Sequence, residues 1–188
     1  MKKTIPLSTL VLLLAAIFSP RGIQAQEAGA HPIPSWLLEN WAARTQGSGV
    51  WITDNSAYQS EQEPFDAYGL HWEYGLGRKS LKGRLFCLKE GQDIGSVWQF
   101  LEYWDPEAGQ ARIVQIGSDG TVGQGVSWED EDGHIREQQK FVSPEGGAFE
   151  SGHQAWMADG SQHTQSYNIL NGEWVKNRYY VWNLKINE

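Results

Sequence analysis

Apolar and polar residues alternate along most of the chain after Gly47, and short runs of turn residues interrupt the alternation. A period of two is typical of strands that bury one face. Several segments end in Asp-Gly or Asn-Gly, which favour tight antiparallel turns because Gly and Asn tolerate positive φ. The pattern predicts about ten strands, the later ones in SVWQFLEYW, ARIVQIG, TVGQGVSW, HIREQQKFV, AFESGHQAWM, SQHTQSYNIL and EWVKNRYYVWNLKI.

Only one segment, PIPSWLLENWAAR, has the spacing of a helix. Trp36, Leu37 and Trp41 fall on one side of it, and Ser35 is suitable as the N-cap. Two prolines precede these residues and set the start. We predict a helix over residues 35–44.

The connections between the predicted strands are too short to hold crossover helices, and only residues 54–66 form a long connection. Antiparallel neighbours in chain order make an up-and-down meander. One open sheet of this size would leave two exposed edges, and closure into a barrel removes them. We therefore predict an all-β fold, an antiparallel up-and-down barrel of about ten strands with a short N-terminal helix. A two-sheet sandwich is the alternative.

The N-terminus has the order of a secretory signal peptide. Lys2 and Lys3 precede an unbroken apolar run from Leu10 to Phe18, and small residues follow. The run is shorter than the roughly 20 apolar residues that span a bilayer. We expect a signal peptide over residues 1–25, one barrel domain over 26–188, a periplasmic or secreted location, and no attachment to a membrane after cleavage.

Charge and cysteine content narrow the choice of partners. Removing residues 1–25 takes away three basic residues and changes the formal net charge from −8 to −11. Nucleic acids and anionic lipid surfaces repel so acidic a chain, and we expect neither as a partner. Cys87 is the only cysteine, so no internal disulfide can form and the fold must be stabilised by packing.

A Gly-x-Trp at Gly49-Val50-Trp51 follows the predicted helix, and Arg178 lies in the last predicted strand. This arrangement resembles the calycin superfamily, the lipocalins and their relatives. The resemblance implies that Trp51 closes one end of the barrel and that Arg178 packs across its ring. The chain lacks the disulfides typical of secreted lipocalins, so transport of lipophiles is not implied. It also resembles a family of uncharacterised exported lipocalin-like bacterial proteins, in the segments WITDNSAY, EPFDAYG, SLKGRLF, EYWDP and GSDGTVGQG.

Histidine is the first candidate for acid–base or metal chemistry. His153 and His163 flank the turn at Asp159-Gly160, and a two-residue turn places 163 opposite 156 and 153 opposite 166. The two imidazoles should therefore point to opposite faces. No spacing gives the three or four convergent ligands that zinc needs, and EDEDG lacks the pattern of a calcium loop. We expect no metal and no cofactor such as haem.

His71 and Glu73 lie two residues apart in an aromatic strand and share one face. On the inner face they would be weak candidates for a general base and the group that orients it. The other interpretation is a solvated outer face, opposite the apolar face of Tyr68, Leu70, Trp72 and Tyr74.

The aromatic content gives the strongest functional indication. Both faces of SVWQFLEYW are bulky, so the helix or a second copy of the chain in a homodimer would have to cover the outer face. Amides such as Gln99, Gln115, Gln124 and Gln139 interrupt the predicted core faces, and aromatic walls with a few amides are typical of a small-molecule pocket. In the other register these amides face water. The loop of residues 54–66 is suited to act as a lid. The predicted ligand contacts are Tyr58, Phe65, Trp72, Tyr74, Trp98, Phe100 and Trp128.

These observations favour an exported barrel that binds a small, partly aromatic or apolar molecule. Two alternatives stay open. One is a periplasmic enzyme that acts on a small molecule inside the barrel through His71 and Glu73. The other is a carbohydrate-binding module, which would need a row of exposed Trp on one outer face.

Overall fold

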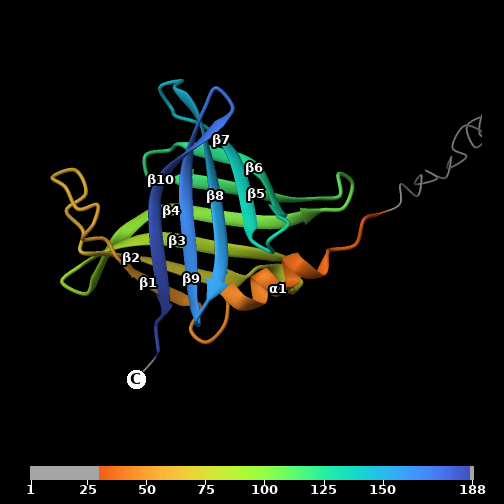
Figure 1. Ribbon diagram of the computed structural model, residues 1–188, viewed down its shortest axis with the longest axis horizontal. Helices are drawn as coiled ribbons and strands as arrows, with labels where there is room; N and C mark the ends of the chain where they lie inside the picture. Colours follow the sequence, from red (N-terminus) through yellow and green to blue (C-terminus); the bar gives the residue numbers. More distant parts are fainter. Residues whose placement is uncertain (1–29, 187–188) are drawn as a thin grey trace, which may run out of the picture.

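The computed structural model describes residues 30–186, and the predicted signal peptide lies outside them. Ten antiparallel strands form a closed barrel with one α-helix, α1 (Ser35–Arg44) (Figure 1). The predicted all-β barrel is confirmed. The strands are β1 (Val50–Asp54), β2 (Ala67–Tyr74), β3 (Ser80–Lys89), β4 (Gln92–Asp105), β5 (Gln110–Gly117), β6 (Val122–Glu129), β7 (Ile135–Val142), β8 (Ala148–Ala158), β9 (Ser161–Leu170) and β10 (Glu173–Leu184).

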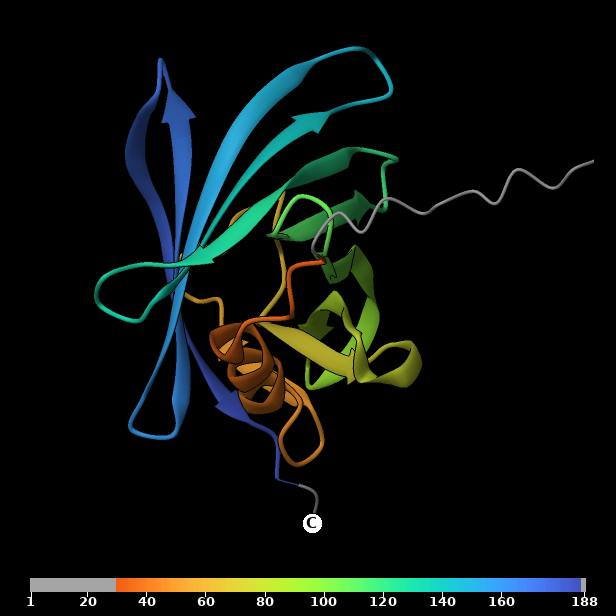
Figure 2. The ribbon, with the colours of Figure 1, turned by 90° about the vertical axis from the view of Figure 1, so that its right-hand side faces the viewer.

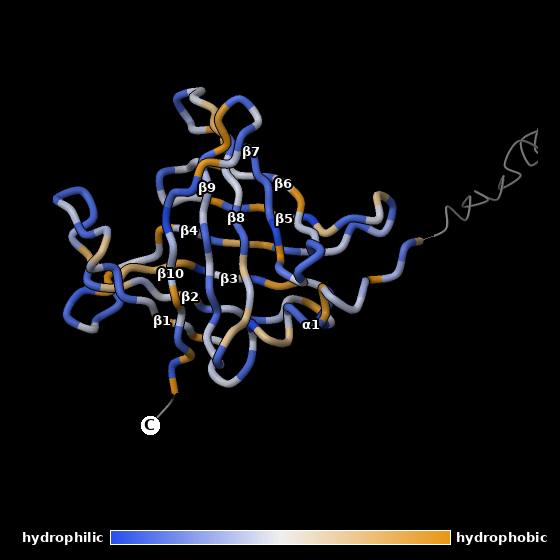
Figure 3. Tube along the Cα trace, viewed as in Figure 1, coloured by the Kyte–Doolittle hydropathy of each residue, from blue (hydrophilic) through white to orange (hydrophobic). Residues whose placement is uncertain are grey.

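Every strand pairs with its neighbours in the chain, and β1 pairs with β10 to close the barrel. The seam places Trp51 opposite Leu184 and Ile52 opposite Asn183. In Figure 1, β8 to β10 run steeply across β3 and β4 behind them, so the barrel has two crossed walls. Most loops are hydrophilic in Figure 3, whereas the strands mix both kinds of residue, as the alternation predicts.

The predicted turn at Asp159-Gly160 is confirmed, because both residues have positive φ, 51° and 77°. His153 pairs with Ser166 and Trp156 with His163, as the two-residue turn requires. The same conformation recurs at Asn171-Gly172. Tight turns of this kind fix the register of the hairpins, and therefore which residues enter the barrel.

Helix α1 has the predicted bounds, but Ser35 is its first residue and not its cap. Pro34 stands at the N-cap with an extended backbone and no side-chain hydrogen bond. The helix lies against one end of the barrel (Figure 2). It buries Leu37 and Trp41 in a core cluster with Trp51 and Leu81. We call this the closed end of the barrel.

Trp51 contributes a polar contact as well as packing at the closed end. Its indole Nε1 donates to the carbonyl oxygen of Arg44 at 2.8 Å, one of the last carbonyls of α1. The last carbonyls of a helix have no partner within the helix. This hydrogen bond therefore links strand β1 to the C-terminal end of helix α1, close to the turn that connects them. Within residues 30–186, no helix is both long and apolar enough to cross a membrane.

Candidate functional site

A cavity of about 430 Å³ lies inside the barrel. Its walls are mostly apolar and come from nearly every part of the sheet. Helix α1 supplies one residue, Arg44, and the loop of residues 55–66 supplies Glu63 and Phe65. The aromatic lining residues are Phe65, Tyr68, Trp72, Trp98, Phe100, Tyr180 and Trp182.

The aromatic walls are held by contacts between rings. Trp72 and Phe100 lie with centroids 5.2 Å apart, and Trp98 meets Phe141 edge to face at 5.6 Å. Gly83 pairs with Trp72 across β2 and β3, and a Cβ there would lie 2.3 Å from the Trp72 ring. The indole therefore lies directly over a glycine, which fixes its position beside the cavity.

Three charged side chains meet under the cavity at the closed end. Arg44 places Nη1 3.5 Å from Glu102 Oε2 and Nη2 3.4 Å from Glu137 Oε1. Its guanidinium also lies 4.9 Å from the centre of the Trp72 ring, a cation–π distance. Trp41 Nε1 donates to Glu102 Oε2 at 2.9 Å. We call Arg44, Glu102, Glu137 and their neighbour His153 the floor of the cavity.

Glu102 is the most deeply buried of the floor groups, with 0% exposure. Burial and the nearby Glu137 charge raise the pKa of Glu102, and Arg44 and the Trp41 hydrogen bond counteract them only in part. Glu102 Oε1 and Ser127 Oγ are both buried without a partner. A proton on Oε1 would give this oxygen a hydrogen to donate, so the orphaned atoms and the raised pKa agree on a protonated Glu102.

His153 faces the cavity from β8. Its side chain is 39% exposed, and this surface is cavity surface, because His153 lines the cavity. Desolvation and the positive charge of Arg44 lower the pKa of His153 to about 4. The imidazole is therefore neutral at pH 7. Its Nδ1 lies 3.9 Å from Glu137 Oε2, which is too long for a hydrogen bond.

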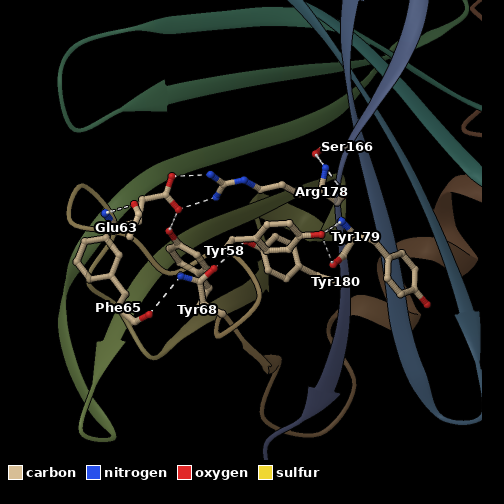
Figure 4. A network of polar contacts seen from close by, with 10 residues as sticks. Tyr58, Glu63, Phe65, Tyr68, Ser166, Arg178, Tyr179 and Tyr180 are labelled. Atoms are coloured by element: carbon tan, nitrogen blue, oxygen red, sulfur yellow. Dashed lines mark hydrogen bonds and ion pairs between the residues drawn. The ribbon is translucent and has the colours of Figure 1, made fainter.

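The loop of residues 55–66 lies at the opposite end of the cavity, where it contributes Glu63 and Phe65 to the lining. Glu63 accepts two hydrogen bonds of 2.6 Å from the Arg178 guanidinium on β10, and one of 3.0 Å from Tyr68 Oη (Figure 4). The Arg178 hydrogen bonds lower the pKa of Glu63. Tyr58 Oη accepts from the backbone N–H of Tyr179 at 2.9 Å. Tyr180 Oη donates to Asn55 Oδ1 at 2.9 Å, so the loop is tied to the last strand at three points. We call this end the mouth.

Four of the seven predicted ligand contacts line the cavity: Phe65, Trp72, Trp98 and Phe100. The other three do not. Tyr58 lies at the mouth and packs edge to face on Tyr180, and Tyr74 lies beyond Trp72 under the guanidinium of Arg78. Trp128 meets Trp174 at 6.3 Å on the outer face, because its neighbour Ser127 is the residue of β6 that points inward.

His71 and Glu73 alternate with Trp72, which lines the cavity, and so lie on the outer face. Glu73 forms an ion pair with Lys82 at 2.8 Å, and its side chain is 56% exposed. Neither residue reaches a molecule inside the barrel.

The expected stacking of Arg178 on Trp51 is not present. Trp51 lies at the closed end, whereas Arg178 lies at the mouth and faces Glu63 and the ring of Tyr58. The pairing of Trp51 with Leu184 places Arg178 six residues further along β10. At about 3.3 Å per residue, a spacing of six residues separates the two positions by roughly 20 Å along the strand. Arg44 is the arginine that meets Trp51, through its backbone carbonyl.

Sequence reasoning missed the floor. Arg44, Glu102, Glu137 and His153 belong to four different elements, and Gln162 is a further buried polar residue of the cavity lining. One signal was present: Glu102 falls on the same side of its strand as Trp98 and Phe100, where an acidic residue is out of place. Of the amides noted in the sequence, Gln115 and Gln139 are buried and joined by a 3.0 Å hydrogen bond, whereas Gln99 and Gln124 are exposed.

One group of potential metal ligands occurs in the described residues, at the β6–β7 turn. The ligand atoms of Asp130, Asp132 and His134 lie within 4.8 Å of one another. Asp130 already accepts hydrogen bonds from two backbone N–H groups of this turn and from Arg136 Nε. Its carboxylate thus has a structural role in the turn, and none of the three residues lines the cavity.

The fold and the site together define a closed ten-stranded barrel with an aromatic cavity and a charged floor. Comparisons of the chain with protein-family models, with curated proteins and with solved structures gave no match in any of the three.

Proposed function

We propose that the chain is an exported, lipocalin-like barrel that binds a small molecule with an aromatic or apolar body. The observation that carries the proposal is the cavity of about 430 Å³ with seven aromatic side chains in its lining. Ligand sites are concave, mostly apolar and supplied with a few convergent polar groups. The volume falls within the range of about 300 to 1,000 Å³ typical of such sites.

The position of the polar groups supports an interior site rather than a surface site. Charged groups lie at the floor and at the mouth, and the aromatic rings lie between them. The outer face also carries Trp128, Trp156 and Trp174, but these rings pack on protein. Trp156 stacks on His163 at 5.4 Å, and Trp174 covers Gly152. Sugars need free aromatic faces, so this arrangement favours the cavity over a carbohydrate platform.

The proposal is tested with N-phenyl-1-naphthylamine, a neutral aromatic probe that fluoresces in apolar surroundings. Binding is compared in the wild type, in Trp98→Ala on the cavity wall, and in the matched control Trp128→Ala on the outer face. We expect Trp98→Ala to weaken binding about tenfold or more, which corresponds to about 1.4 kcal/mol. Trp128→Ala should leave the dissociation constant unchanged.

Equal binding by both variants, or no binding by the wild type, would contradict an interior site. Far-UV circular dichroism and a urea unfolding curve show whether each variant retains the barrel. Native mass spectrometry of the protein from its own host then identifies the natural ligand, as an added mass that is lost on denaturation.

A further inference from the structure

This inference rests on the proposed function and concerns the chemical class of the ligand. Glu137 presents one carboxylate oxygen to the cavity. Its Oε1 faces Arg44 at 3.4 Å, but among residues 30–186 no donor reaches Oε2 within hydrogen-bond distance, and His153 Nδ1 stops at 3.9 Å. The side chain is 9% exposed and lines the cavity. A buried carboxylate oxygen is costly unless a donor satisfies it, so the site calls for a donor from the ligand.

A second buried group with an unsatisfied acceptor lines the same cavity. Gln162 is 3% exposed, and its Oε1 has no hydrogen-bond partner. Neutral His153 keeps one ring nitrogen as a further acceptor. The Nη1 and Nη2 donors of Arg44 are already directed at Glu102 and Glu137, and its Nε, like Trp72 Nε1 and Gln162 Oε1, is a buried atom without a partner. The acceptors of the floor that face the cavity are therefore Glu137 Oε2 and one ring nitrogen of His153.

The charges of the floor also favour a ligand that donates hydrogen bonds over one that accepts them. Two carboxylates, Glu102 and Glu137, share one guanidinium. The only other arginine in the lining, Arg178, is engaged by both oxygens of Glu63 at the mouth. With Glu102 protonated, Arg44 and Glu137 balance each other in the free protein, and the added charge of a ligand ammonium would be balanced when Glu102 releases its proton. A ligand carboxylate would instead place a further negative charge beside Glu137.

We propose that the ligand is an amine that enters ammonium-first and donates to Glu137 Oε2, while its apolar body lies between the aromatic walls. The gap between Glu137 Oε2 and His153 Nδ1 suits a nitrogen with more than one N–H, because one such atom can donate to both groups. Trp72 and Phe100 lie next to the floor and receive the first part of the body.

Three probes of one shape test the proposal: 4-phenylbutylamine, 4-phenylbutan-1-ol and 4-phenylbutanoate. Isothermal titration calorimetry at pH 7 gives the three dissociation constants for the whole chain. We expect the amine to bind at least tenfold more tightly than the carboxylate, with the alcohol between them. Glu137→Gln should reduce the preference for the amine to less than about threefold, and Glu150→Gln, on the exposed outer face, should leave it unchanged.

The outcomes separate the two proposals. If the carboxylate binds as tightly as the amine while N-phenyl-1-naphthylamine still binds, the amine proposal is overturned and the interior site stands. If neither the three probes nor the naphthylamine binds, both fail. The comparison of probes in the wild type needs no variant. Should Glu137→Gln not fold, Gln162→Leu replaces it and should weaken the amine severalfold without weakening the carboxylate.

Discussion

Replacement of Glu102 by Gln tests the protonation of the cavity floor. Glu102 is fully buried, and its Oε2 accepts from Trp41 Nε1 at 2.9 Å. Gln has the shape of a protonated Glu. Its carbonyl oxygen preserves the bond from Trp41, and its amide supplies a donor at the place where Glu102 Oε1 and Ser127 Oγ have no partner. The variant should therefore fold with the same network.

The expected magnitude follows from proton linkage. Burial raises the pKa of Glu102 above the usual value of 4.5. Above that pH the unfolded chain has lost a proton that the folded protein still holds, so the free energy of unfolding falls as the pH rises. The slope is at most about 1.4 kcal/mol per pH unit and ends when the pH passes the folded pKa. Glu102→Gln has no such slope, so its stability relative to the wild type should increase with pH.

Urea unfolding followed by tryptophan fluorescence, at pH values from about 4.5 to 8, measures this difference. His153 has an effect of opposite sign. The pKa of His153 is lowered to about 4 in the folded protein. Between about pH 4 and pH 6.5, His153 is therefore protonated only in the unfolded chain, and the free energy of unfolding rises with pH in that window. Both proteins contain His153, and its contribution cancels in the difference. A difference independent of pH would mean that Glu102 is ionised, and would refute the reasoning.

Two further predictions concern packing and the mouth. Gly83→Ala should lower the free energy of unfolding by about 1 to 3 kcal/mol, because its Cβ would lie 2.3 Å from the Trp72 ring. The midpoints of urea unfolding measure this change, with Gly147→Ala as the control. An equal loss of stability in both variants would contradict the prediction. Glu63→Gln should cost less than about 1 kcal/mol, since the pair is partly exposed. It should nevertheless speed amide exchange in residues 55–66, and unchanged exchange would show that Arg178 does not hold the loop.

The fold was predictable because its signals are local. Alternation in segments such as Tyr68–Tyr74 and the turn at Asp159-Gly160 depend on neighbours in the chain, and each strand pairs with the next. A two-residue turn also determines the facing pairs, so the opposite orientations of His153 and His163 followed from spacing alone.

The site was less predictable because it depends on long-range placement. Alternation divides a strand into two faces but does not say which of them points inward when both are aromatic, as at Trp128. A bulge between Lys176 and Tyr179 shifts the register of β10, so the orientation of Arg178 cannot be counted from the start of its strand. The floor joins α1, β4, β7 and β8, and no pattern within one segment links Arg44 to Glu137.

The β1–β10 seam has a consequence for how the chain folds. All other strand pairings join consecutive strands and can form as hairpins while the chain is still incomplete. The seam joins Trp51 to Leu184 and is reinforced by the backbone N–H of Lys185, which donates to Val50 at 2.7 Å. Closing so long a loop is entropically costly and slow compared with closing a hairpin. Until β10 docks, β1 keeps an unpaired edge that is open to other chains, so the β10 residues that pair with it protect it from aggregation.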